Sequence, residues 1–211
     1  IKNMWSLIEE YEISIKIVDD LFDGVEYDLK NKLEINSKKE LLIYSYRVAG
    51  TVGLMMAKIL NVKDKNSLKS SIDLGIAMQL TNISRDIIED SKRNRFYVLH
   101  NFDSIKETLK IADLFYESSF ASIKKIPLSF RFSILVARRV YRKIGHNILN
   151  KKTIENYNNS GKIYVNNIGK IIQTFLSLYD LLRLLLIKDK DHLRYKEHQI
   201  INEEINLNER F

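Results

Sequence analysis

Residues 79–97 read QLTNISRDIIEDSKRNRFY, and neither glycine nor proline interrupts them. Their apolar residues recur at helical spacing, which predicts one long helix through most of this stretch. Because residues four apart share one face of a helix, Asn82, Asp86 and Asp90 form a polar column, with Gln79 one turn before it. The stretch therefore predicts a helix that carries a line of oxygen-bearing side chains.

This column has two interpretations. Two carboxylates at i and i+4 repel each other and cost an isolated helix about 0.2–0.5 kcal/mol. They are tolerated on a wet surface, where Arg85 would pair with Glu89, or where a cation neutralises them. The uncharged amides of the column add little on a surface but are good donors and acceptors in a site. Carboxylate and amide oxygens with room for water suit Mg²⁺, so the column is a candidate metal site.

The composition indicates an all-α protein. The 211 residues include one proline and seven glycines, and 45% of them are hydrophobic. The absence of cysteine excludes disulfides, thiolate metal sites and cysteine nucleophiles, and it fits a reducing compartment. The formal charge of +7 is not gathered into a dense basic run and comes with no recognition motif, so we expect no nucleic-acid partner.

The start of the chain is unusual. It begins at Ile1 rather than Met, in the middle of a helical pattern, and shows no signal peptide or apolar run long enough to span a bilayer. We therefore expect a fragment or a processed product.

The apolar pattern predicts helices over residues 5–21, 38–60, 67–91, 103–123, 130–149 and 165–187. We expect a break between helices at Asp23 and Gly24, and a polar loop over residues 156–161. The last helix is apolar on most of its circumference, which predicts a core or membrane-facing position. Residues 1–187 are expected to form one helical domain, and residues 188–211 a charged, mobile tail.

Three glycines interrupt the predicted helices, and each costs about 1 kcal/mol relative to alanine. Gly50, Gly53 and Gly75 would allow either tight packing of two helices or the close approach of a long apolar ligand. The spacing leaves both explanations open.

Other polar residues carry weaker signals. Asp19, Asp20 and Asp23 could ligate a cation, but their position next to a predicted helix break favours a structural role. The four histidines show no metal-binding spacing, and we interpret them as surface or structural residues. They are His100, His146, His192 and His198.

Two segments, 44–53 (YSYRVAGTVG) and 75–90 (GIAMQLTNISRDIIED), together resemble the squalene/phytoene synthase family. The sequence of residues 48–56, VAGTVGLMM, is most similar to that of bacterial phytoene synthases. Residues 95–97 and 137–144 resemble later motifs of the same family. The likeness covers about residues 18–170.

The resemblance implies an isoprenoid-synthase fold, a helical bundle around a central cavity. It implies Mg²⁺-dependent head-to-head condensation of two geranylgeranyl diphosphates to phytoene through a cyclopropylcarbinyl diphosphate, with Mn²⁺ as an alternative metal. One alternative is a squalene, hydroxysqualene or dehydrosqualene synthase that uses farnesyl diphosphate; squalene formation needs NADPH, whereas phytoene formation needs no reductant. Another alternative is a non-catalytic family member that acts as an assembly or interaction protein.

The resemblance also assigns roles to residues of this chain. The metal would be held by Asn82, Asp86 and Asp90. The diphosphate would be contacted by Gln79, Arg85, Arg95 and Lys162, of which Lys162 is the loosest match. The prenyl channel would be lined by Val48, Val52 and Gly53. Tyr44 and Tyr141 match tyrosines placed near the reacting carbons, where rings and hydroxyls can steer a cation.

One feature of the family is missing from this chain. The family carries an earlier Asp-x-x-x-Asp motif on a helix, and nothing like it precedes Trp5. We therefore expect an upstream segment that carries it, and expect the 211 residues alone not to complete the reaction. Prenyl diphosphates are the expected substrates. The expected location is the cytoplasm of a bacterium, with peripheral membrane contact as an alternative for releasing a lipophilic product.

Overall fold

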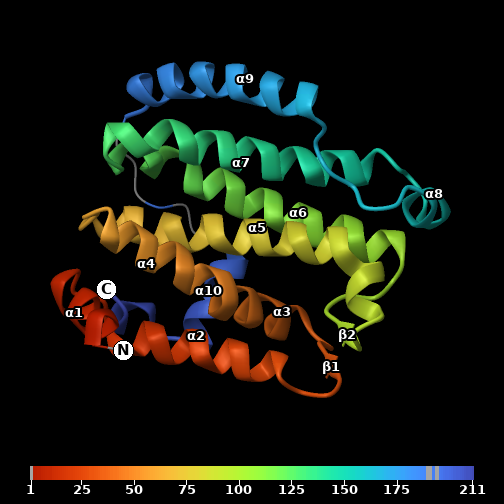
Figure 1. Cartoon of the computed structure of the whole chain (residues 1–211), viewed down its shortest axis with the longest axis horizontal. Coiled ribbons are helices and arrows are strands. Elements are labelled where there is room, and N and C mark those ends of the chain that lie inside the picture. The colour runs from red at the N-terminus through yellow and green to blue at the C-terminus, as the bar shows by residue number, and fades with distance from the viewer. Residues whose placement is uncertain (1, 189–191, 193–194) are drawn as a thin grey trace.

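The computed structural model describes residues 2–188, 192 and 195–211, and almost all of these residues lie in helices or the turns between them. The central helix is α5 (Lys65–Ser91), which contacts α4, α6 and α7 and the π-helical turn η1. Figure 1 shows the helices before α5 on one side of it, and α6, α7 and α9 on the other. The predicted all-α fold is confirmed.

The remaining elements follow in chain order. Before α5 lie α1 (Lys2–Glu10), α2 (Ile15–Asp28), β1 (Leu33–Glu34), α3 (Lys38–Ser45), η1 (Tyr46–Gly50) and α4 (Thr51–Ile59). After α5 lie β2 (Arg95–Phe96), α6 (Phe102–Phe120), η2 (Ala121–Lys125), α7 (Leu128–Leu149), α8 (Ile154–Asn159), α9 (Asn167–Leu186), α10 (Lys196–Glu204) and η3 (Leu207–Glu209).

The start of α5 is fixed by a side-chain cap. The Asp64 carboxylate accepts a hydrogen bond from the Ser67 backbone N–H, which satisfies one of the free donors at a helix start. Apolar residues of α5 then fall into the largest core cluster, which α2, α3, α4 and α6 complete. At about 1.5 Å per residue, this helix is about 40 Å long and gives the column a rigid support.

Gly53 and Gly75 lie where α5 crosses α4 and η1. A Cβ on Gly53 would lie 2.2 Å from the Ser71 carbonyl oxygen, and one on Gly75 would lie 2.2 Å from the Ala49 carbonyl oxygen. No side chain fits at such distances, because both neighbours are backbone atoms. Helix packing therefore accounts for both glycines.

A short parallel strand pair ties the segment before α3 to the segment after α5. β1 pairs with β2, with Leu33 opposite Arg95 and Glu34 opposite Phe96. The Leu33 and Ile35 N–H groups donate to the carbonyl oxygens of Asn94 and Phe96 at 3.0 and 2.9 Å. This pairing holds the end of α2 next to the end of α5.

Two local predictions are wrong. The predicted break at Asp23 and Gly24 does not occur, because α2 continues through both residues and Gly24 packs closely against Val48 of η1. The chain instead turns between α1 and α2, where Glu12 adopts a positive φ of 50°. The predicted loop at residues 156–161 contains most of the short helix α8, which is capped by Thr153.

The predicted mobile tail is also wrong for the part of it that the structure describes from residue 195 onward. Helix α10 packs against α3, and Ile201 and Ile205 join the main core. Arg210 donates from Nε and NH2 to both carboxylate oxygens of buried Asp20, each at 2.9 Å, and the Tyr46 hydroxyl donates to the same carboxylate. The end of the chain is therefore anchored to α2 and η1.

A second anchor lies at Asp73 in the middle of α5. Its buried carboxylate lies 2.6 Å from His192 Nε2 and 3.1 Å from His198 Nε2, and Ser118 also donates to it. Burial raises the pKa of Asp73, but the hydrogen bonds from the two histidines outweigh burial and hold the pKa below its usual value. His198 Nδ1 accepts from the Tyr195 N–H, which assigns its proton to Nε2. His192 and His198 thus connect the C-terminal segment to α5.

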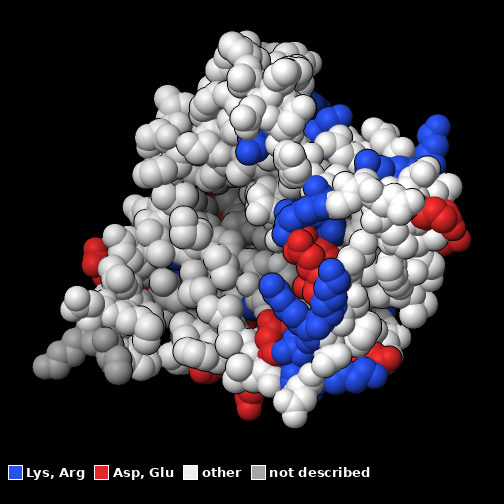
Figure 2. All heavy atoms as spheres, turned by 45° about the vertical axis from the view of Figure 1, so that its right-hand side comes forward, with Lys and Arg blue, Asp and Glu red and all other residues white. Residues whose placement is uncertain are grey.

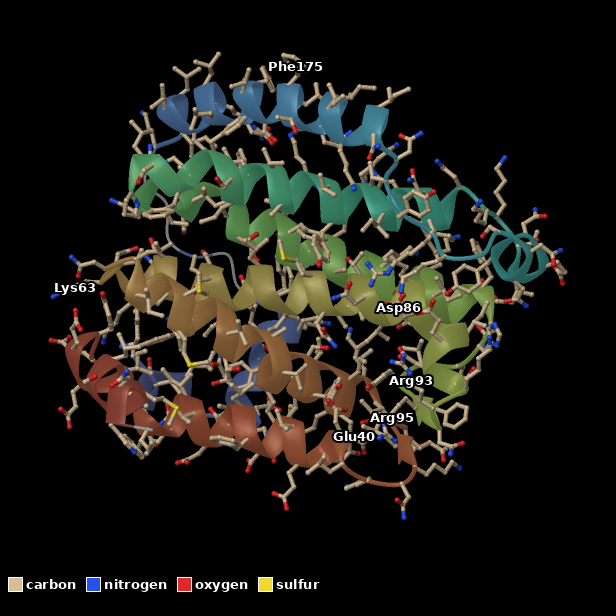
Figure 3. The ribbon with its side chains drawn as sticks, viewed as in Figure 1. Glu40, Lys63, Asp86, Arg93, Arg95 and Phe175 are labelled. Atoms are coloured by element: carbon tan, nitrogen blue, oxygen red, sulfur yellow. The ribbon has the colours of Figure 1, made fainter. Side chains whose placement is uncertain are left out.

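Helix α9 packs on α7 through one face and leaves a broad apolar face exposed. The exposed side chains recur every three or four residues: Ile168, Ile172, Phe175, Tyr179, Leu182 and Leu186. Phe175, which is 68% exposed, points away from the rest of the molecule (Figure 3). In the described part of the chain, no helix is long and apolar enough to cross a bilayer.

Candidate active site

An apolar cavity of about 350 Å³ lies between α4 and α5. The three residues predicted to line a prenyl channel, Val48, Val52 and Gly53, all line it. Met56, Leu74 and Met78 add further apolar wall, and η2 and α7 contribute Ile123 and Ile134. The volume and apolar lining are those of a small-molecule site.

One end of this cavity meets the polar column. Gln79 and Asn82 both line the cavity, and Asp86 and Asp90 follow Asn82 at one and two turns along α5. Asn82 Oδ1 is buried and has no hydrogen-bond partner among the described residues. A buried polar atom without a partner costs free energy, and here the unpaired oxygen lies at the junction between apolar wall and carboxylates.

Two cations predicted to bind diphosphate contact the carboxylates of this region. The Arg85 guanidinium donates from Nε and NH2 to the two oxygens of Asp86, at 2.8 and 2.5 Å. Lys162 Nζ lies 2.8 Å from Glu89 Oε2 and 3.5 Å from Asp86 Oδ1. Figure 2 shows acidic and basic side chains gathered side by side, next to a hollow. The side chains of Arg85 and Lys162 therefore lie where an anionic ligand would bind beside the column.

Asp90 has the most perturbed carboxyl of the column. Burial raises its pKa to about 6, and the negative charges of Asp86, Glu89 and Asp28 contribute, while Arg93 opposes them. The carboxylate is thus held in an environment that disfavours its charge. Figure 3 shows Asp86 on the second half of α5, with Arg93 and Arg95 just beyond the helix end.

The structure brings one further acidic residue to this end of the site. Asp28, at the end of α2, accepts from the Tyr44 hydroxyl at 2.9 and 3.1 Å and from the Tyr97 hydroxyl at 3.3 Å. The rings of Tyr44 and Tyr97 stack at 5.0 Å between centroids. Burial, helped by the negative charges of Asp28 and Asp90, raises the pKa of Tyr97 to about 12 against the opposing hydrogen bond from Tyr44. Burial also raises the pKa of Tyr44, so both rings keep their protons at neutral pH.

Asp28 and Tyr97 are the members that sequence reasoning missed. The residues of this cluster are 16 to 69 positions apart in the chain, and helical periodicity connects only positions a few residues apart. The link between them is made by the strand pair β1–β2, whose two-residue length leaves almost no trace in the sequence.

Two other predicted site residues lie near this cluster. Arg95 donates from NH1 and NH2 to the carbonyl oxygens of Lys30 and Asp28, at 2.8 and 2.6 Å, so its guanidinium holds the end of α2. Its predicted contact with diphosphate stays a prediction. Tyr141 on α7 packs against the main core and is near enough to Arg85 to interact with it electrostatically.

The weaker acidic candidates lie away from the column. Asp20 accepts from Tyr46 and Arg210, and Asp23 forms an ion pair with Arg47 at 2.9 Å. Asp19 is exposed. His100 and His146 are exposed as well.

The donor set on α5 fits a hard divalent cation. It offers an unpaired amide oxygen on Asn82 and two carboxylates on the same helix face, and the carboxyl of Asp90 has its pKa raised by burial and like charge. A cation at the column would pair the orphaned oxygen and remove the repulsion between carboxylates. Ligands from a single helix face leave several coordination positions for water or phosphate, as Mg²⁺ prefers.

Comparison with known proteins agrees with this geometry. The family model for squalene/phytoene synthase matches residues 3–98. The chain is 34% identical over 144 residues to a 15-cis-phytoene synthase of Paracoccus sp., which is 60% of this chain and 47% of that protein. It is 37% identical over 131 residues to a 15-cis-phytoene synthase of Enterobacter agglomerans, or 52% of this chain and 44% of that protein. The chain thus spans about half the length of these relatives.

Solved structures share the fold. A dehydrosqualene synthase superposes with a TM-score of 0.66 at 24% identity, covering 82% of this chain and 67% of that one. A squalene synthase from Alicyclobacillus acidocaldarius gives a TM-score of 0.60 at 17% identity, covering 68% and 62%. The protein therefore has the all-α isoprenoid-synthase fold. Together with the sequence matches, which include the segment that carries the cavity and the column, this makes the chain similar to the squalene/phytoene synthase family in both sequence and fold.

Proposed function

We propose that the protein carries out Mg²⁺-dependent head-to-head condensation of two geranylgeranyl diphosphates to phytoene, a step of carotenoid biosynthesis. The observation that carries the proposal is the junction at Asn82, where an apolar cavity meets a column of metal-type ligands. A prenyl diphosphate has the same division into a long apolar chain and a charged head. The names of the relatives favour phytoene as the product.

In the proposed reaction the C–O bond of one substrate breaks, and its electron pair leaves with diphosphate. The double bond of the second substrate attacks the allylic cation, and proton loss closes a cyclopropane ring. The second diphosphate then leaves, and rearrangement with loss of a proton gives phytoene without a reductant. Bound Mg²⁺ would stabilise the negative charge that develops on each departing diphosphate.

The residues of this chain would hold the two ends of the substrate. Val48, Val52 and Gly53 would exclude water from the prenyl chain, as their place in the cavity wall supports. Arg85 and Lys162 would turn from Asp86 toward diphosphate oxygens, because a cation at the column would take over the neutralisation of that carboxylate.

The tyrosines would act on the cationic intermediates. The hydroxyl of Tyr44 is fixed by Asp28 and Tyr97, so its ring is held in one orientation near the column. An aromatic face can stabilise a nearby cation electrostatically. We propose that the ring of Tyr141 on α7, which interacts electrostatically with Arg85, also stabilises a cationic intermediate.

The test is incubation of the full-length gene product with radiolabelled geranylgeranyl diphosphate and Mg²⁺, followed by analysis of the lipid products. We expect a C40 product, and at least a hundredfold loss of turnover in Asp86→Ala with unchanged helicity by circular dichroism. A dominant C30 product from mixed substrates would favour a squalene-type synthase. The enzyme proposal fails if neither a C30 nor a C40 product forms.

A further inference from the structure

The apolar cavity follows α5 over a measurable length. Its lining residues on α5 begin at Asn82 and continue back along the helix to Ser67. These two residues are 15 positions apart, which corresponds to about 22 Å at 1.5 Å per residue. Because the column continues beyond Asn82 in the other direction, distance along α5 measures depth from the charged end.

The opposite wall runs antiparallel and has a fixed register. Gly75 meets the backbone of Ala49, and Gly53 meets the backbone of Ser71. Ala57 is one helical turn beyond Gly53, so it lies deeper than Ser71, about 6 Å further from the column. Ala57 therefore belongs to the last third of the cavity, together with Ser67.

Prenyl chains of different length would end at different depths. An extended peptide advances about 3.3–3.6 Å for three backbone bonds, so an isoprene unit with four chain bonds advances about 4.5 Å by the same bond geometry. Three units then span about 14 Å, and four units about 18 Å. Measured from Asn82 at about 1.5 Å per residue, a three-unit chain ends short of Ser71, whereas a four-unit chain reaches Ser70.

Four small side chains, Ala57, Ser67, Ser70 and Ser122, line the deep end of the cavity, together with the larger Leu60 and Val62. Ser70 on α5 donates to Ser122 of η2 at 2.8 Å, which satisfies both hydroxyls and leaves an uncharged wall. Ala57 is only 4% exposed, and its carbonyl oxygen accepts from the Val62 N–H at 3.0 Å. Space at this depth is therefore preserved by residue size, and larger residues here would remove it.

We infer that this deep end selects twenty-carbon over fifteen-carbon prenyl chains, and that Ala57 and Ser122 are the residues that determine the selection. The inference rests on the proposed function, because it assumes that the diphosphate lies at the column. The fourth isoprene unit ends beside Ser70 and Ser122, about 4.5 Å short of the level of Ala57, which lines the cavity just beyond that end. A three-unit chain leaves the space beside Ser70 and Ser122 empty and loses the contacts made there.

The experiment measures binding rather than turnover. Isothermal titration with Mg²⁺ compares farnesyl and geranylgeranyl thiolodiphosphates, whose bridging sulfur replaces the oxygen of the bond that would ionise. The wild-type chain is expected to bind the C20 analogue at least about tenfold more tightly than the C15 analogue. Ala57→Leu is expected to bring this ratio close to one by weakening only the C20 analogue.

Two further variants complete the test. Ser122→Phe should lower the same ratio from the opposite wall, and it serves as the main variant if circular dichroism shows that Ala57→Leu is unfolded. Ala121→Phe is the matched control, because Ala121 is the neighbour of Ser122 on η2 but does not line the cavity. This control should keep the wild-type ratio.

The outcomes separate the inference from the function on which it rests. Tight binding of both analogues with equal affinity by the wild-type chain, or an unchanged ratio in both cavity variants, overturns the inference alone. If neither analogue binds the wild-type chain, the proposed function fails and the inference fails with it.

Discussion

Asp90 is the residue at which the electrostatics of the column can be measured directly. Its pKa is raised to about 6 in the folded chain, whereas an unfolded aspartate has a pKa of about 3.9. Below about pH 3 the carboxyl is protonated in both states. As the pH rises from 4 to 6 the unfolded state ionises first, and the folded state loses stability relative to it.

Because ionised Asp90 destabilises the folded state, removing its charge should stabilise the protein, and this gives a prediction for Asp90→Asn in the absence of divalent metal. The variant should match the wild-type free energy of unfolding at about pH 3 and exceed it at pH 7 by about 1 kcal/mol, after allowance for solvent screening of a half-exposed group. Urea unfolding at both pH values measures the difference. Asp19→Asn, at an exposed position, is the control. A gain of equal size at about pH 3 and at pH 7 would contradict the raised pKa.

Single residues also show how far the sequence could lead. Gln79, Asn82, Asp86 and Asp90 share one helix, so 3.6-residue periodicity was sufficient to place them in one column. The contacts of Asp28 with the tyrosines depend on where α2 ends relative to α5. That placement results from packing of distant segments, which no local pattern encodes.

At the scale of elements, the crossing of α4 and α5 is the contact most sensitive to substitution. Gly53→Ala would gain up to about 1 kcal/mol in helix propensity, but its Cβ would lie 2.2 Å from the Ser71 carbonyl oxygen. The helices would have to separate, and we expect a net loss of about 2 kcal/mol in the free energy of unfolding. Chemical denaturation monitored by circular dichroism measures this loss.

A matched glycine on another helix controls for helix propensity. The Cβ of Gly145→Ala on α7 would meet only Leu109 Cδ2, at 3.2 Å, and that side-chain end can move. We expect this variant to stay within about 1 kcal/mol of the wild type. Equal losses in the two variants would show that backbone contact at the crossing is not the cause.

The elements themselves were partly predictable. Helices with strong apolar periodicity, such as those over residues 67–91 and 130–149, appear close to their predicted bounds. The break predicted at Gly24 fails because glycine there allows close packing inside a helix. The composition of the segment from residue 195 resembles that of a solvated tail. Its charged side chains nevertheless form ion pairs with other helices, such as Glu197 with Lys38 at 2.6 Å.

At the scale of the whole molecule, the end of the chain is part of its stability. Arg210 and Asp20 form a largely buried ion pair, with side chains 14% and 8% exposed. Arg210→Ala would leave the Asp20 carboxylate with Tyr46 alone, and loss of one partner from such a pair costs about 3 kcal/mol. Urea unfolding measures this cost.

The exposed pair between Lys16 and Glu209 supplies the comparison. Both side chains are about half exposed, so Lys16→Ala should cost less than about 1 kcal/mol. If Arg210→Ala is as mild as Lys16→Ala, the C-terminal anchor contributes little to the fold.

The exposed face of α9 has a consequence for the energy of the molecule as a whole. Ile168, Ile172, Phe175, Leu182 and Leu186 are each at least half exposed. Full burial of such a side chain is worth about 1.5–3 kcal/mol, so covering what remains exposed of these five would contribute about 5–10 kcal/mol. The net stability of an entire domain is of the same size, about 5–15 kcal/mol. In water, the apolar contribution from covering this one helix face, before the cost of association is subtracted, is therefore comparable to the net stability of a whole domain.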